Sequence, residues 1–187
     1  KYNNKESLKK YLDTSEPYNE NDYPSFSEVK SIISMSEIDS LNKMNYQTLI
    51  IDFDNESISI IMEKCKSLKD ILKNKEISVE SLLTYFSELV KYVESQNEAG
   101  NYFYDLKPDN ILVCDNNDTS DIMPNQKILK PIDPGYSIGT IGYSPFLEDF
   151  QMKPNIYGRI ETIDKFCLIS ILFEIKTGKK LFDILTG

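Results

Sequence analysis

The sequence predicts an α+β fold in which a β-hairpin lies between an N-terminal helix and a mainly helical C-terminal part. Two runs rich in β-branched residues, Thr48–Phe53 and Ser57–Met62, flank the turn-forming residues Asp54–Glu56 and indicate the hairpin. Apolar residues recur at helical spacing in Pro24–Met44 and in Ser78–Asn97, which predicts a helix on either side of it.

The composition fits one folded domain, or most of one. The chain has 187 residues, and 40% of them are hydrophobic, which is enough to build a core. The net charge of −9 comes without a stripe of lysine and arginine, so we expect no nucleic-acid partner. No apolar run reaches membrane-spanning length and no signal peptide is visible, so we expect no membrane partner either.

The cysteine pattern argues against a metal or a disulfide framework. Cys65, Cys114 and Cys167 are odd in number, lie far apart and form no C-x-x-C pair, and the chain has no histidine. Zinc sites and a Ser-His-Asp triad are therefore disfavoured. The pattern predicts reduced thiols in a cytosol-like compartment and hence a cytoplasmic protein.

The N-terminal part is polar and turn-rich up to Tyr23, which predicts a loop. The helix Pro24–Met44 follows, with a break near Ser34–Ser36, and Ser25 or Ser27 is a suitable N-cap. Its apolar positions are Val29, Ile32, Ile33, Ile38, Leu41 and Met44.

The clearest helix covers Ser78–Asn97. Ser78 suits an N-cap, and Gly100 suits the left-handed residue that ends a helix. The apolar stripe of this helix consists of Val79, Leu82, Leu83, Phe86, Leu89, Val90 and Val93.

Two strands are predicted further along the chain, Ile111–Cys114 and Lys127–Ile132, and a surface turn over Asp115–Gln126 joins them.

One short loop holds a set of side chains suited to phosphoryl transfer. Asp105, Lys107 and Asn110 stand at positions 0, +2 and +5, with Pro108 between them and an apolar run directly after. Such a reaction needs a carboxylate to orient a hydroxyl, a cation near the transferred group and an amide oxygen to hold Mg²⁺. An isolated Asp-x-Lys would be an ordinary solvated turn.

The surrounding segment Tyr102–Val113 resembles the catalytic loop of eukaryotic-type Ser/Thr protein kinases, H-R-D-L-K-P-x-N, with Phe103 and Tyr104 in place of His and Arg. Further stretches follow in the order of that family. They are Asp133–Gly135, similar to D-F-G with proline in place of phenylalanine; Gly139–Pro145, similar to the end of the activation segment; and Glu161–Phe182, similar to the central helix of the C-lobe.

The resemblance implies a role for each polar residue of the site. Asp105 accepts the proton of a substrate hydroxyl, and Lys107 steadies the γ-phosphoryl group of ATP. Asn110 and Asp133 hold Mg²⁺.

Structural roles are implied for Gly135 and Asp164, the latter as an acceptor for backbone N–H groups of the catalytic loop. The activation segment is short, and Tyr104 leaves no arginine beside the catalytic loop. Control by phosphorylation of that segment is therefore not expected.

The nucleotide-binding residues are implied by position alone. Lys9, or its neighbour Lys10, matches the family's phosphate-binding lysine, although a solvated lysine pair is the alternative. Glu37 matches the glutamate that pairs with this lysine; an ordinary exposed helix glutamate is the alternative, and Glu28 is a second candidate.

Segment 62–65 resembles the hinge that binds adenine in kinases. Met62 would stand at the back of the pocket, and the backbone of Glu63 to Cys65 would bind the adenine edge. The implied architecture is a reduced N-lobe over residues 1–62, with a strand remnant, a helix and the hairpin, and a partial C-lobe over residues 63–187.

Two classes of function follow from the resemblance. The first is an ATP- and Mg-dependent Ser/Thr protein kinase acting on a protein substrate. The second is a pseudokinase that binds a protein partner without transfer, because no G-x-G-x-x-G motif occurs in the chain and Pro134 alters the metal-binding motif. A third reading is that the sequence is a piece of a longer kinase, divergent and truncated.

Overall fold

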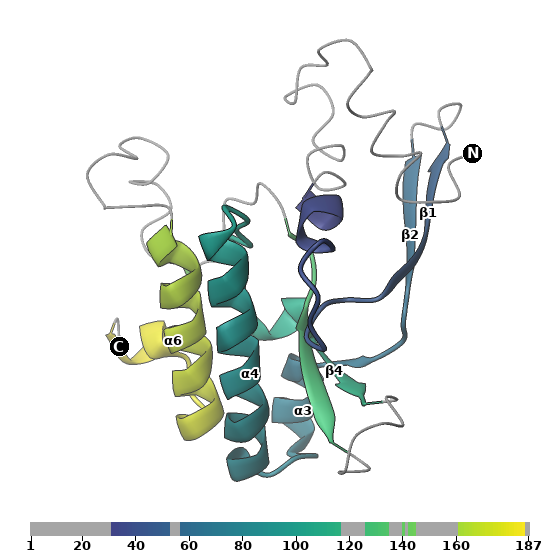
Figure 1. Ribbon diagram of the computed structural model, residues 1–187. Coiled ribbons are helices and arrows are strands. Elements are labelled where there is room, and N and C mark those ends of the chain that lie inside the picture. The colour runs from purple at the N-terminus through teal and green to yellow at the C-terminus, as the bar shows by residue number, and fades with distance from the viewer. Residues whose placement is uncertain are drawn as a thin grey trace.

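The computed structural model describes residues 31–52, 57–116, 126–134, 140, 142–144 and 161–185. Within them the fold is α+β, with two small sheets and several helices (Figure 1). Strands β1 (Tyr46–Asp52) and β2 (Ser57–Met62) pair antiparallel. This hairpin, which the sequence predicted, stands apart from the long helices in Figure 1.

A second sheet carries the connection into the helical part. Its antiparallel order is β3 (Lys66–Ser67), β4 (Ile111–Asp115) and β5 (Lys127–Pro131), and Ile111 of β4 lies opposite Pro131 of β5. The two strands predicted after the catalytic loop are therefore confirmed. The register brings the start of β4 next to the end of β5, so the residues flanking these points gather at one edge of the sheet.

Two helices lie between β3 and β4, namely α3 (Leu68–Asn74) and α4 (Val79–Glu98). The predicted N-cap is confirmed, since the Ser78 hydroxyl oxygen accepts a hydrogen bond from the Ser81 backbone N–H. The chain leaves α4 through Gly100, whose φ of +83° lies in the left-handed region that glycine tolerates best.

The core forms where α4 contacts β5 and α6 (Glu161–Thr177), with α7 (Leu181–Leu185) packed beside α6 (Figure 1). Most of the apolar stripe of α4 is buried there, whereas Leu83 and Val90 are partly buried and Val79 is exposed. Leading core side chains are Leu68, Ile71, Leu82, Phe86, Leu89, Val93, Phe103, Leu106, Ile111, Leu129, Cys167 and Ile171.

The predicted helix over Pro24–Met44 is wrong for its second half. Residues 31–35 are helical, residues 24–30 lie outside the described part, and turns and loop follow from residue 36 to β1. The Ser36 hydroxyl donates to the Ile33 carbonyl oxygen at 2.7 Å, which satisfies an end carbonyl of the helix. The Asn42 amide donates to the Leu129 carbonyl oxygen of β5 at 2.8 Å. The segment is thus held by the sheet rather than by its own helical period.

The expectation of three reduced thiols is also wrong. Cys65 and Cys114 form a disulfide, and only Cys167 is free, buried inside the core. The two partners are 49 residues apart in sequence, but the pairing of β3 with β4 brings them together. The cysteine pattern therefore gives no argument for a cytoplasmic location. None of the described helices is long and apolar enough to cross a membrane.

Candidate active site

The loop from Phe103 to the 3₁₀ turn η1 (Pro108–Asn110) is held from below by one carboxylate. Asp164 of α6 is fully buried and accepts from the backbone N–H of Phe103 at 2.9 Å and of Tyr104 at 2.8 Å. Tyr104 has φ of +61°, an uncommon conformation for a bulky residue. Such strain persists only where surrounding contacts enforce it, and it clusters at functional sites.

The environment of Asp164 raises the pKa of its carboxyl group. Burial raises the pKa of the Asp164 carboxyl from 3.8 to about 6, and the N–H groups of Phe103 and Tyr104 oppose that rise. With its amide nitrogen facing Asp164, the Asn97 side chain donates to Asp164 Oδ2 and to the Asn101 carbonyl oxygen, both at 3.0 Å. A short polar network therefore joins the end of α4, the loop and α6.

Asp105 is buried and only partly satisfied. Its Oδ2 accepts from Lys107 Nζ at 2.7 Å and from Asn110 Nδ2 at 3.4 Å. Its Oδ1 is buried and has no hydrogen-bond partner among the residues that the structure describes. An unpaired buried acceptor costs about 1–3 kcal/mol. An incoming hydroxyl group would remove that cost.

Lys107 bridges the loop and the stretch around residue 140. Besides Asp105, Lys107 Nζ donates to Thr140 Oγ1 at 2.8 Å. Thr140 is held in turn, because its carbonyl oxygen accepts from the N–H of Tyr143 at 3.0 Å and of Ser144 at 3.1 Å. The Tyr143 hydroxyl donates to Glu174 of α6 at 2.5 Å, and burial raises the pKa of this phenol.

Asn110 and Asp133 come together at the edge shared by β4 and β5. The Ile132 N–H donates to the Asn110 carbonyl oxygen at 2.9 Å, one residue before Asp133. The Asn110 side-chain nitrogen donates to the Asp105 carbonyl oxygen at 3.0 Å, so the amide oxygen is the atom that could bind a cation. Asp133 is exposed and has φ of +60°. A carboxylate and an amide oxygen fit a hard cation such as Mg²⁺.

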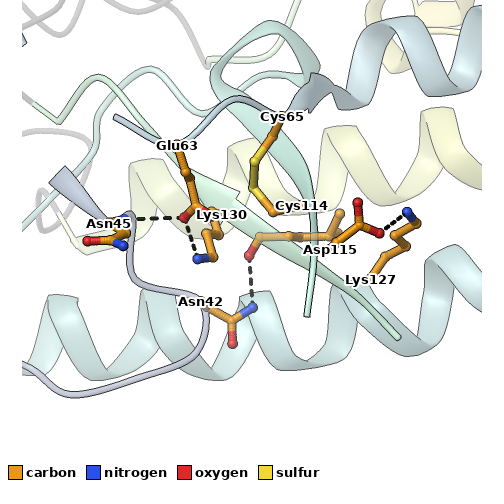
Figure 2. Close-up of a disulfide and its surroundings, with 9 residues drawn as sticks. Asn42, Asn45, Glu63, Cys65, Cys114, Asp115, Lys127 and Lys130 are labelled. Carbon is orange, nitrogen blue, oxygen red and sulfur yellow. Dashed lines mark hydrogen bonds and ion pairs between the residues drawn. A yellow bond between two sulfur atoms is a disulfide. The ribbon is translucent and has the colours of Figure 1, made fainter. Parts of the chain in front are cut away.

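The hinge-like connection from β2 to β3 is tied to the second sheet. Glu63 pairs with Lys130 of β5 at 2.5 Å and accepts from the Asn45 N–H at 3.4 Å (Figure 2). Met62 is half-buried at the end of β2, and Cys65 is engaged in the disulfide.

Of the remaining expected residues, the structure describes Glu37 alone. Glu37 is exposed in the turn that follows the helical residues 31–35. Lys9, Glu28 and Gly135 lie outside the described residues.

Sequence reasoning did not single out Thr140 or Lys130. Thr140 belongs to a recognised stretch, Gly139–Pro145, so its motif was the available signal. Lys130 stands between the apolar residues Leu129 and Pro131, and a lysine in such a place points to a buried partner.

Comparison with known proteins finds weak homology to serine/threonine protein kinases. The chain is 27% identical over 167 residues to the serine/threonine-protein kinase unc-51 of Caenorhabditis elegans, covering 84% of this chain and 19% of that protein. It is 34% identical over 169 residues to a probable serine/threonine-protein kinase of Dictyostelium discoideum, covering 78% of this chain and 25% of that protein. The chain thus spans about a fifth to a quarter of these curated relatives. No protein-family model matches it.

Proposed function

We propose that this chain is a divergent protein-kinase-like domain that transfers the γ-phosphoryl group of ATP to a serine or threonine hydroxyl of a protein. The observation that carries the proposal is the group formed by Asp105, Lys107 and Thr140, in which Asp105 Oδ1 has no partner among the described residues. The weak homology to serine/threonine kinases supports the same reading.

Asp105 acts as the acceptor for the substrate hydroxyl. In the transfer, the hydroxyl oxygen forms a bond to the γ-phosphorus, the bond from that phosphorus to the ADP oxygen breaks, and the hydroxyl proton moves to the Asp105 carboxylate. Lys107, already within 2.7 Å of Asp105, supplies positive charge beside the transferred group. Thr140 limits the positions that the Lys107 ammonium group can take.

Asn110 and Asp133 would hold Mg²⁺, which would neutralise the charge of the phosphates. Pro134 is buried and lines a small cleft with Met35 and Phe103, so an apolar contact is kept where the family motif has phenylalanine. The replacement therefore need not remove the metal site.

The nucleotide would lie between an N-lobe of residues 1–62 and a C-lobe of residues 63–187. The backbone of Glu63 to Cys65 would bind the adenine edge, with Met62 behind it. Binding of the ATP phosphates by Lys9, and pairing of Lys9 with Glu37, stay predictions.

A second candidate is a pseudokinase that binds Mg²⁺·ATP and a protein partner without transfer. Two departures from the family motifs favour it, Pro134 in place of phenylalanine and Phe103-Tyr104 in place of His-Arg. Phosphoryl transfer depends almost wholly on positioning and electrostatics, so small departures can abolish the rate while binding persists.

Nucleotide binding is tested first by thermal unfolding with Mg²⁺·ATP, with ATP plus EDTA, and with Asp133→Asn. ATP at 100 times its dissociation constant should stabilise the chain by about 2.7 kcal/mol, which is a shift of a few degrees for a chain of this size. The shift should require Mg²⁺ and be lost in the variant. Cooperative melting without any shift would contradict both candidates.

Transfer is then tested by Asp105→Asn. Loss of the proton acceptor should lower the rate about 10²–10⁴-fold, without loss of Mg²⁺·ATP binding. The matched control is Asp109→Asn, which alters an exposed carboxylate of the same loop that pairs with Lys69 at 2.6 Å. A wild-type chain that binds Mg²⁺·ATP but phosphorylates no mixture of serine and threonine peptides would favour the pseudokinase.

A further inference from the structure

We propose that Cys65 and Cys114 form a reversible disulfide that locks the hinge-like segment 63–65 against β4, so that oxidation strengthens nucleotide binding. The effect on nucleotide binding rests on the proposed function, whereas the restraint of segment 63–65 by the disulfide does not.

The pairing of two strands brings the cysteines together. Lys66 of β3 lies opposite Val113 of β4, so Cys65 and Cys114 are the next residues facing each other along this antiparallel pair. Their Cα atoms are 4.9 Å apart, within the range that a disulfide spans. Figure 2 shows the bond between the incoming hinge-like segment and the strand. The bond thus needs no displacement of either backbone.

The same short segment has a second attachment that is not redox-dependent. Glu63, two residues before Cys65, pairs with the buried Lys130 of β5, and the two contacts lie side by side in Figure 2. Reduction would release one attachment and leave the other. The segment would then keep its general place and lose rigidity, which is the behaviour expected of a switch rather than of a purely structural cross-link.

Both attachments join the segment to strands that lie next to the proposed metal ligands in the chain. Cys114 of β4 lies four residues after Asn110, which directly precedes this strand. Lys130 of β5 lies three residues before Asp133, which follows the end of its strand. The disulfide therefore ties the expected adenine-binding backbone to the strand that follows the catalytic loop. A pre-organised segment loses less conformational entropy when a ligand binds, so the oxidised form should bind more tightly.

The chemistry needs an oxidant, and glutathione disulfide is a suitable class. The thiolate of one cysteine attacks glutathione disulfide and releases one glutathione thiolate. The second cysteine thiolate then attacks this mixed disulfide, closes the Cys65–Cys114 bond and releases a second glutathione. Two electrons pass to glutathione disulfide, and the two cysteine protons end on the two glutathione thiols.

The surroundings of the pair leave the exchange to Cys65 and Cys114. The Glu63 carboxylate lies within 4.8 Å of both sulfur atoms, and its charge is paired with Lys130. Cys167 does not compete, because it is buried in the core and burial raises the pKa of its thiol.

The experiment equilibrates the full chain in buffers of glutathione and glutathione disulfide at different ratios. The fraction of disulfide is measured by alkylation and mass spectrometry. Amide hydrogen exchange of residues 63–67 and the Kd for Mg²⁺·ATP are measured in the fully reduced and fully oxidised states. Cys65→Ser and Cys114→Ser serve as matched variants that cannot close the bond.

Oxidation should slow exchange in residues 63–67 by about tenfold and lower the Kd for Mg²⁺·ATP by about fivefold or more. Both serine variants should behave like the reduced wild type in every buffer. Glu63→Gln should keep the redox response, because it removes the ion pair and leaves the thiols.

Several results would overturn the inference. One is a pair that stays reduced in excess glutathione disulfide, and another is equal exchange of residues 63–67 in the two states. A reduced chain that retains one equivalent of Zn²⁺ at these residues would make the pair a metal site instead. Equal Kd values with different exchange rates would overturn the nucleotide coupling alone. Absence of Mg²⁺·ATP binding in both states would overturn the proposed function. The exchange rates would still show whether the disulfide restrains residues 63–67.

Discussion

The catalytic-type loop and the hinge-like segment are both short connections at the same three-stranded sheet, but they are held in different ways. The loop is held by the Asp164 carboxylate, which is 0% exposed and bonds two backbone N–H groups. Segment 63–65 is half-exposed and is held by a disulfide and one ion pair. The first connection is held by hydrogen bonds inside the core around α6, whereas one of the two contacts that hold the second is a bond that reduction would open. A loop of constant geometry can thus lie beside an adjustable segment.

The largest expected effect concerns the loop. Asp164→Ala leaves the N–H groups of Phe103 and Tyr104 buried and unpaired and removes two charge-assisted hydrogen bonds. We expect a loss of about 3–5 kcal/mol in the free energy of unfolding, measured by urea denaturation. The control Asp115→Ala removes an exposed carboxylate that pairs with Lys127, and should cost under about 1 kcal/mol. Equal losses in the two variants would mean that Asp164 does not organise the loop.

The next effect concerns the hinge-like segment. Reduction of the disulfide frees a cross-link between residues 49 apart, and the free energy of unfolding should fall by about 2–4 kcal/mol. Urea denaturation with and without dithiothreitol measures this loss. Cys65→Ser should show the lower stability in both conditions. If dithiothreitol destabilised this variant as much as the wild type, the effect would not come from the Cys65–Cys114 bond.

A third test uses the pH dependence of the free energy of unfolding, which should respond to Asp164 below the loop and not to Glu63 in the hinge-like segment. The pKa of Asp164 is about 6 in the folded chain and 3.8 ordinarily, so between these values the folded state binds more protons than the unfolded state. Stability should therefore fall as the pH rises from about 4 to about 6, by about 3 kcal/mol. Asp164→Asn should lack this component, and Glu63→Gln should retain it. Parallel curves for wild type and Asp164→Asn, from urea denaturation at each pH, would contradict the assignment.

The smallest expected effect on stability concerns the N-cap of α4, which lies outside both regions and gives a reference value for the other variants. Ser78→Ala removes the N-cap of α4 and should cost about 1 kcal/mol. Ser87→Ala, within the same helix, alters an exposed hydroxyl that donates to the Thr84 carbonyl oxygen, and should change stability by under about 0.5 kcal/mol. A Ser78→Ala cost no larger than that of Ser87→Ala would show that the cap contributes nothing.

Local patterns in the sequence determined much of the fold. The hairpin strands, β4 and β5, helix α4 and its cap at Ser78 were all predictable, because periodicity and capping are encoded within a few neighbouring residues. The spacing of Asp105, Lys107 and Asn110 likewise needs no tertiary information. The helix predicted beyond residue 35 failed because Asn42 bonds the distant Leu129 carbonyl oxygen of β5.

Tertiary structure alone decided which distant residues meet. The Cys65–Cys114 bond, the contact of Lys107 with Thr140 and the pair of Glu63 with Lys130 join residues 49, 33 and 67 positions apart. No local pattern encodes such contacts, since they arise from strand register and from packing between elements. The sequence by itself therefore determined the chemical groups that the site contains, and the fold decided how they are paired, because pairing depends on distances that exist only once the sheet and helices have packed.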